Sequence, residues 1–445
     1  MVSAASILFT LATGITAVLA SLENTNVVRH IDLTRPYLKS TVEIDVTNPD
    51  RSSAQSYNYI LPKDEYETLA DLKVVDSKNN TLDFTLGSEI EQNYQQLVIA
   101  FDEPLKKGET ETLTVYIFAT KSVFPLPEVA KQADLQEVVF ESSKNYISEY
   151  HTTKEQLQIF APIRQLTDFS EGVSSPDGVP LKADHNNMIR FDAQEDVAPF
   201  TEKSLVLRYN FPLSITTVAN LDRTISMDTL RNKLYFDESY DLINTGTKLD
   251  NDFSRIDYVR NPGAGLNMVA LRRLFLHLPA DHADEYYVDL VGNVSTSQVH
   301  KTMMEVFPRY PLMGGWHYNF TVGWSSELSQ YLRHTDNNFI LRVPIILGPD
   351  RVSITTLNNK IVLPKGAKNI EAYDDMGGVV DFENTKPSLF DLYSNPTVNI
   401  RFNHIVTEDR SRQIYVTYQY SVLSRFKLPF TLVTIVATIF YFLKR

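Results

Sequence analysis

Residues 31–48 read IDLTRPYLKSTVEIDVTN, and this stretch decides the fold class. From Val42 to Val46, apolar and acidic side chains alternate along the chain. Alternation with a period of two puts one face of a strand on a core and the other face in water. The same pattern recurs at residues 113–117, 318–324 and 414–418. We therefore expect a mainly β protein built from short strands.

A second stretch weakly repeats the first. Residues 225–244 read ISMDTLRNKLYFDESYDLIN. A triplet that ends in Leu-Pro follows each stretch, Ile-Leu-Pro at residues 60–62 and His-Leu-Pro at residues 277–279. An order repeated at an offset near 200 predicts two related domains in tandem. We expect two antiparallel β-sandwich-like domains at residues 21–215 and 216–424. The alternative is that two unrelated halves share only their strand composition.

Composition excludes several classes of function. The chain has 445 residues, 42 basic and 55 acidic side chains, and no cysteine. A net charge of −13 argues against a nucleic-acid-binding protein, because no basic excess is present to neutralise phosphates. The absence of cysteine excludes disulfides, thiolate-bound zinc and thiol catalysis. A mean hydropathy of −0.20 argues against a polytopic membrane protein.

The two ends predict a topology. Residues 1–20 carry no charged side chain and contain an apolar run, so we expect a signal peptide. The alternative is that these residues form a buried N-terminal helix. Leu428–Leu443 is free of charge, lies between basic residues, and as a helix would be about 24 Å long. We expect residues 425–445 to form one transmembrane helix with a minimal cytosolic tail. The body would then lie in the lumen, as in a type I membrane protein.

A lumenal body gives meaning to Asn-x-Ser/Thr triplets, which accept N-linked glycans. Three occur, at Asn79, Asn293 and Asn319. All three asparagines are candidate glycosylation sites.

The usual catalytic motifs are not found in the sequence. It has no GxSxG, HExxH, GxGxxG or Walker loop. Asp250-Asn251-Asp252 is a DxD triplet, which in some glycosyltransferases holds a divalent cation and a sugar nucleotide. It lies in a polar stretch, so we interpret it as a solvated loop, with a DxD glycosyltransferase as the minor alternative. We expect no catalytic residue, no metal site and no cofactor.

One segment is unusually rich in aromatic rings, glycine and proline. Residues 307–324 read FPRYPLMGGWHYNFTVGW and contain both tryptophans of the chain. Trp316, Tyr318 and Trp324 are candidate interface residues, because such side chains anchor protein interfaces. The alternative is a bent strand pair in which Gly314-Gly315 permits a close approach of backbones.

At this segment the sequence resembles a known family. The stretches YYVDLVGNVSTS (286–297) and RYPLMGGWHYNFTVGW (309–324) look like signatures of the ribophorin I family, the large lumenal β-rich subunit of the endoplasmic reticulum (ER) oligosaccharyltransferase complex. Three shorter stretches also match, namely FPLPE (124–128), FSRIDYVR (253–260) and LPKGAKNI (363–370). The chain is similar to the fungal-type form, which lacks the cytosolic helical domain.

The resemblance implies a non-catalytic subunit in the ER membrane. The complex transfers a preassembled oligosaccharide from dolichyl diphosphate to the Asn of Asn-x-Ser/Thr in nascent proteins. Its catalytic subunit carries a WWD motif, and this chain has no Trp-Trp pair. The implied partners are the catalytic and other subunits, membrane lipid around the single span and, as a further candidate, nascent polypeptide; no nucleic acid is expected. The alternative is an independent lumenal receptor or chaperone that binds clients through its sandwich surface.

Overall fold

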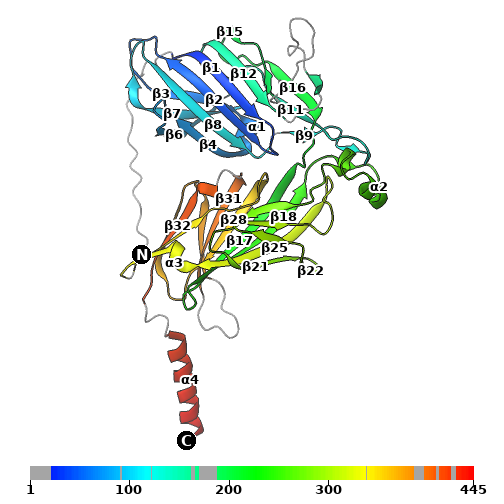
Figure 1. The fold of residues 1–445 in the computed structure, drawn as a ribbon. Helices are drawn as coiled ribbons and strands as arrows, with labels where there is room; N and C mark the ends of the chain where they lie inside the picture. Colours follow the sequence, from blue (N-terminus) through cyan, green and yellow to red (C-terminus); the bar gives the residue numbers. More distant parts are fainter. Residues whose placement is uncertain are drawn as a thin grey trace.

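A computed structural model describes residues 22–90, 93–121, 123–161, 166–169, 188–336, 338–384, 395–406, 410–421 and 427–444. The predicted signal peptide, residues 1–20, lies outside these ranges. Strands dominate the described chain, so the prediction of a mainly β protein is confirmed (Figure 1).

The first half of the chain forms three sheets. The largest has the order β14-β12-β1-β2-β8-β4-β5, with β15 also paired to β12. Its strands are β1 (Glu23–Asp32), β2 (Leu38–Thr47), β4 (Leu69–Val75), β5 (Thr81–Leu82), β8 (Thr110–Ala119), β12 (Thr152–Phe160), β14 (Met188–Arg190) and β15 (Gln194–Val197). The smaller sheets are β3 (Ala54–Pro62), β7 (Tyr94–Leu105) and β6 (Phe84–Ile90), and β13 (Leu166–Phe169), β16 (Ser204–Asn210), β11 (Glu137–Ser143) and β9 (Phe124–Pro125). The short helix α1 (Lys63–Glu67) follows β3.

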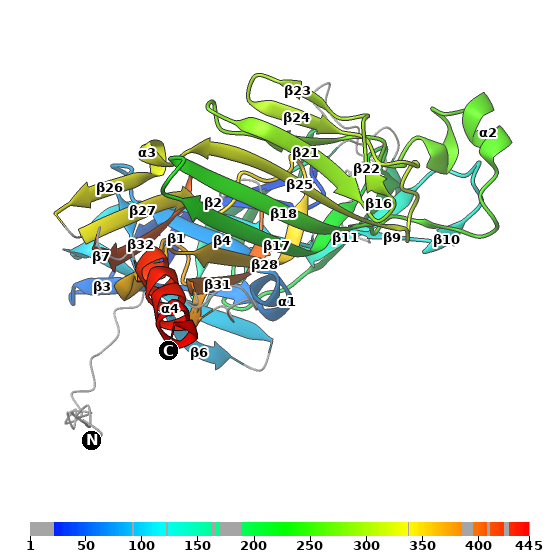
Figure 2. The same ribbon diagram turned by 90° about the horizontal axis from the view of Figure 1, so that it is seen from below.

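The second half also forms three sheets. The largest has the order β22-β21-β25-β18-β17-β28-β31-β30 and is seen lengthwise in Figure 2. Its strands are β17 (Thr216–Asp228), β18 (Lys233–Asn244), β21 (Ala283–Asp289), β22 (Gly292–Asn293), β25 (His317–Glu327), β28 (Ser353–Val362), β30 (Val379–Asn384) and β31 (Pro396–Ile405). The smaller sheets are β20 (Leu274–His277), β24 (Met303–Val306) and β23 (Gln298–His300), and β26 (Leu332–Thr335), β27 (Asn338–Pro344), β32 (Gln413–Gln419) and β29 (Lys368–Asp374). The helices are α2 (Arg255–Arg260), the 3₁₀ turn η1 (Gly265–Asn267) and α3 (Leu328–Tyr331).

The two large sheets share one strand order. The order β12-β1-β2-β8-β4-β5 in the first corresponds to β28-β17-β18-β25-β21-β22 in the second. Both repeated stretches, residues 31–48 and 225–244, run from the end of the first strand through the second strand of a hairpin. Even the β-bulge recurs, between Asn24 and Asn26 in β1 and between Val218 and Asn220 in β17. The weak sequence repeat therefore marks corresponding hairpins.

The expectation of antiparallel sheets is wrong for one strand pair in each of the two large sheets. β1 pairs parallel with β12, and β17 pairs parallel with β28. β1 and β17 each lie inside their sheet, and each pairs along one side with its hairpin partner, β2 or β18. Its other edge is filled by a strand that arrives through a long connection, and such a connection allows parallel pairing.

Apolar side chains between the sheets form the cores. Two clusters of buried residues lie in residues 22–215, and one large cluster lies in residues 218–420. A small fourth cluster joins Ala130 to Leu266, Val269 and Met313. The layers are thus held mainly by burial of apolar area, without any disulfide.

Contacts across residue 215 join the two halves. β10 (Val129–Ala130) pairs in parallel with β19 (Lys248–Leu249). On the opposite side, Arg412 Nη2 lies 2.5 Å from Asp71 Oδ1. The division into domains at residue 215 stays a prediction.

The C-terminal helix is α4 (Lys427–Leu443), with 17 residues. Among the described residues, no helix has both the length and the apolar character that a membrane crossing requires. At 1.5 Å per residue, α4 is about 26 Å long, shorter than a hydrocarbon core of about 30 Å. The prediction of a transmembrane helix at residues 425–445 is therefore not confirmed.

Candidate functional site

The aromatic-rich segment forms a loop followed by β25, in the middle of the second large sheet. Along β25, Tyr318, Phe320 and Trp324 point into the core, whereas His317 and Asn319 are exposed. The alternation predicted from residues 318–324 is therefore present in the strand.

Burial narrows the candidate interface. Tyr318 and Trp324 are only 4% and 2% exposed, because the same alternation turns both rings inward. Trp324 stacks on Phe236 with ring centroids 5.2 Å apart. A partner could reach neither ring in the folded chain. We therefore correct the interface assignment and restrict it to Trp316, which is half-buried at the start of the strand.

A row of rings connects Trp316 to the core. Tyr310 lies 5.8 Å from Trp316 and 5.6 Å from Tyr318, and the Tyr318 ring lies 5.5 Å from Phe320. On its other side, Trp316 packs edge to face against Phe253 at 5.5 Å. Edge-to-face pairs at these distances are favourable because the ring edge is positive and the face negative. Trp316 is thus held rigidly between two neighbours.

The glycine pair before Trp316 is required by backbone contact. A Cβ atom on Gly314 would lie 2.0 Å from the carbonyl oxygen of Thr247, and Gly315 has a φ of +80°. Gly314 forms a parallel bridge with Lys248, and Gly315 N–H donates to the Asn244 carbonyl at 2.7 Å. The predicted close approach at Gly314-Gly315 is therefore confirmed.

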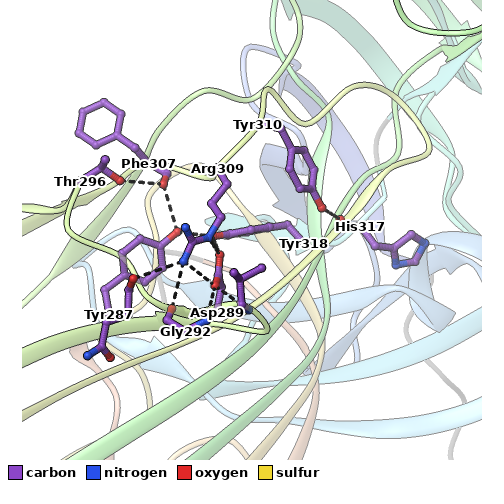
Figure 3. A network of polar contacts seen from close by, with 11 residues as sticks. Tyr287, Asp289, Gly292, Thr296, Phe307, Arg309, Tyr310, His317 and Tyr318 are labelled. Atoms are coloured by element: carbon purple, nitrogen blue, oxygen red, sulfur yellow. Dashed lines mark hydrogen bonds and ion pairs between the residues drawn. The ribbon is translucent and has the colours of Figure 1, made fainter.

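Beside this loop, Asp289 is the centre of a polar network (Figure 3). Arg309 forms a two-pronged ion pair with Asp289 through Nε and Nη2, and Nη2 also donates to the carbonyls of Gly292 and Asn293. The Tyr318 hydroxyl donates to Asp289 at 3.1 Å. The hydrogen bond from Arg309 lowers the pKa of Asp289 to about 2. The network ties the loop to the β21–β22 hairpin.

A tyrosine pair extends the network inward. The hydroxyls of Tyr287 and Tyr318 are 2.6 Å apart, and Tyr287 donates to the Phe307 carbonyl at 3.1 Å. Burial raises the pKa of both phenols, so both stay protonated at neutral pH. No titrating group on this network is poised for acid–base chemistry, and the arrangement is suited to holding a loop in place.

The three glycosylation candidates lie on exposed positions. Asn79 sits in the turn between β4 and β5 with a φ of 66°, and Asn293 lies in the hairpin strand β22. Asn319 lies on the outer face of β25. Since β5 corresponds to β22 in the shared strand order, Asn79 and Asn293 occupy corresponding hairpins.

The DxD triplet is an exposed loop after β19, as expected. Asp252 borders a surface depression that Trp316 and Phe253 also line, whereas Asp250 does not. The structure thus brings Asp252, Phe253 and Trp316 together.

Sequence reasoning missed Phe253 and the Asp289–Arg309 pair. Their signal was the position of each within a stretch that matches the family.

Comparisons with known proteins give the relationship. The sequence profile described as Ribophorin I matches residues 22–444. The chain is 25% identical to an Arabidopsis thaliana protein named dolichyl-diphosphooligosaccharide–protein glycosyltransferase subunit 1A, over 91% of this chain and 67% of that protein. It is 26% identical to the Schizosaccharomyces pombe protein named dolichyl-diphosphooligosaccharide–protein glycosyltransferase subunit 1, over 78% of each chain.

Among solved structures, the likeness is small. Native yeast LTA4 hydrolase matches with a TM-score of 0.28 and 12% identity, over 47% of this chain and 32% of that chain. A likeness at this level supports no inference. The family assignment therefore rests on the sequence profile, which covers all of the described residues. The chain belongs to the ribophorin I family.

Proposed function

We propose that this chain is a non-catalytic subunit of an oligosaccharyltransferase complex. The complex would transfer a preassembled oligosaccharide from dolichyl diphosphate to the Asn of Asn-x-Ser/Thr in nascent proteins. The observation that carries this proposal is the family match over residues 22–444, together with relatives named as subunit 1 of that glycosyltransferase. The sequence supports the non-catalytic role, because the catalytic subunit carries a WWD motif and this chain has no Trp-Trp pair.

Co-purification tests this function. After mild detergent solubilisation, we expect an affinity-tagged full chain to recover a polytopic partner that carries the WWD motif. Depletion of the chain should lower glycosylation of Asn-x-Ser/Thr sites in several unrelated glycoproteins. A lone monomer, with glycosylation intact and only particular clients failing to mature, would favour the receptor or chaperone alternative.

The proposed location is the ER membrane, with the body in the lumen and a type I topology. The support is the uncharged apolar run within residues 1–20 and the Asn-x-Ser/Thr triplets on exposed positions. In intact microsomes, the body should be protected from added protease and become sensitive after detergent. Digestion in intact microsomes would contradict this topology.

We propose that Asn79, Asn293 and Asn319 carry N-linked glycans. All three side chains are exposed, and no described fold contact covers them. Single Asn→Gln variants should each lose one glycan, measured as a step in electrophoretic mobility after partial glycosidase digestion. If a Gln variant migrates like the unaltered chain, the site that it removes carries no glycan.

Trp316 is the proposed contact residue of the aromatic-rich segment. It is the one ring of the three original candidates that reaches the surface. Trp316→Ala is expected to weaken a contact made there, and the buried Trp324 is the comparison position. The nature of that contact follows from the surface around the ring.

A further inference from the structure

A surface depression of about 290 Å³ opens beside Trp316, just below the range of about 300–1,000 Å³ that ligand sites occupy. We call it the Trp316 depression. It is lined by Lys248, Leu249, Asn251, Asp252, Phe253, Gly314, Gly315 and Trp316. All of these residues are in the second half of the chain, after β18.

One side of the Trp316 depression is aromatic and rigid. The rings of Trp316 and Phe253 lie 5.5 Å apart with an interplanar angle of 72°. Tyr310 holds Trp316 from the other side at 5.8 Å, and Tyr258 packs on Phe253 at 5.6 Å. Because both rings are fixed before any ligand arrives, little rotamer freedom is lost when a ligand stacks on them.

The glycine pair lets this loop pack directly against the segment around Thr247 and Lys248. Gly314 presents no side chain, and the stem of Lys248 runs over Gly315, whose Cβ would lie 2.8 Å from Lys248 Cγ. Backbone amides and carbonyls near the surface add directional contacts.

The remaining lining is polar and unengaged. Within the described chain, the side chains of Lys248, Asn251 and Asp252 are exposed and make no hydrogen bond or ion pair with other residues. The ammonium donates, the carboxylate accepts and the amide does both. The two formal charges of Lys248 and Asp252 cancel, so the lining favours a neutral ligand with many hydroxyl groups over an ion.

We propose that the Trp316 depression binds a neutral sugar ring of an oligosaccharide. A pyranose has one face of weakly positive C–H groups, which suits the negative face of an aromatic ring. Its rim of hydroxyls matches the donors and acceptors of Lys248, Asn251 and Asp252. This inference deepens the proposed function, on which it rests for the class of ligand.

Intrinsic fluorescence of the purified full chain provides the test. The chain has two tryptophans, of which Trp316 lines the depression and Trp324 is buried. Titration with mannotriose or N,N′-diacetylchitobiose should change the emission saturably. Asp252→Asn should weaken binding about tenfold, because a charged hydrogen-bond acceptor is lost. Asp250→Asn is the matched control, since this carboxylate belongs to the same triplet but lies outside the depression, and it should change affinity less than about twofold.

Two further measurements keep the proposal falsifiable. Trp316→Ala should abolish saturable binding in calorimetry while circular dichroism shows an intact β fold. No saturable signal with either sugar, or equal loss in the Asp250 and Asp252 variants, would overturn the proposal. Saturable binding of a proline-rich peptide but not of sugars would assign the depression to a polypeptide instead. Co-purification of Asp252→Asn with the complex should be unchanged, which separates failure of this inference from failure of the proposed function.

Discussion

The two halves of the molecule hold an arginine at the same place in different ways. Arg29 in β1 and Arg223 in β17 are 194 positions apart, as are Ile31 and Ile225, so the two arginines occupy corresponding positions. Each donates from Nη1 to two backbone carbonyls, those of Ser143 and Asn145 for Arg29 and those of Pro344 and Ile345 for Arg223. The shared fold therefore keeps a cation whose role is to satisfy carbonyls of a facing segment.

The difference lies on the neighbouring strand. Opposite Arg29 in the β1–β2 ladder stands Val42, whereas opposite Arg223 in the β17–β18 ladder stands Glu238. Arg223 and Glu238 are 0% and 1% exposed, with Nε and Oε1 2.9 Å apart, while Arg29 is half-buried. The Arg223 guanidinium is completely buried and has an acid, Glu238, beside it on the next strand. An unpaired buried charge is costly, so this pairing accompanies the burial.

The largest effect is expected from Arg223→Met. It leaves Glu238 buried without its counter-ion, which should destabilise the fold by about 3–5 kcal/mol. Urea denaturation followed by tryptophan fluorescence measures it, since Trp324 stacks on Phe236 and the Arg223 guanidinium lies 5.2 Å from the same ring.

The double variant Arg223→Met, Glu238→Leu is its control. Removing both charges should recover most of the loss, because an apolar pair of similar volume replaces a buried ion pair with little penalty. A double variant as unstable as the single one would mean that the carbonyls of Pro344 and Ile345 account for the loss. The two halves would then differ less than the burial of their arginines indicates.

Arg29→Met should have a smaller effect, about 1–3 kcal/mol, because the nearby buried Glu155 keeps its hydrogen bonds from the Asn145 amide and the Tyr146 N–H. Its loss removes the donor to the carbonyls of Ser143 and Asn145 and to the Ser142 hydroxyl. Hydrogen exchange of peptides from β1 and β2 measures it, with peptides from β17 and β18 as the internal control. An effect equal to that of Arg223→Met would contradict the comparison.

Near Arg29, a carboxyl group makes the first half sensitive to pH. Glu65 and Arg29 line the same cavity of about 40 Å³, and burial raises the pKa of Glu65 to about 7. The unfolded value is about 4.3, so between pH 4.3 and 7 the folded chain binds the proton more tightly than the unfolded chain. The contribution of Glu65 to stability is therefore greatest at low pH within this window and falls as pH rises through 7.

Glu65→Gln tests this dependence. The variant should flatten the fall in stability of the first half between pH 5 and 8, measured by hydrogen exchange corrected for the intrinsic rate at each pH. An unchanged slope would assign the dependence to another group. Glu67→Gln is the neighbouring control, since Glu67 is exposed in the same helix α1.

Local patterns in the sequence predicted the strands but not their distant partners. The alternation around Val42–Val46 and along residues 318–324 corresponds to β2 and β25, because a period of two is a property of one strand. The parallel partner of Arg29 is Leu157, 128 positions later, and no local pattern specifies it.

The candidate site followed the same rule. Trp316, Gly314 and Gly315 were singled out from their local sequence, and the structure gives each a defined contact. Tyr318 and Trp324 were assigned to a surface although their alternation favours the core. Phe253 and Asp252 join Trp316 only because β19 and the loop before β25 run side by side, a long-range contact through Gly314 and Lys248.

The smallest expected effect lies at the junction of the halves. Arg412 bonds Asp71 Oδ1 at 2.5 Å and also donates to the Asp375 carbonyl at 2.9 Å, and both side chains of the pair are partly exposed. Asp71→Asn should cost less than about 1 kcal/mol, because water screens an ion pair at this depth. If the halves nevertheless unfold in separate steps in this variant but together in the unaltered chain, coupling between them depends on this pair. If they still unfold together, the coupling resides in the β10–β19 pairing and the apolar contacts. Arg29 and Arg223 would then stabilise one cooperative unit.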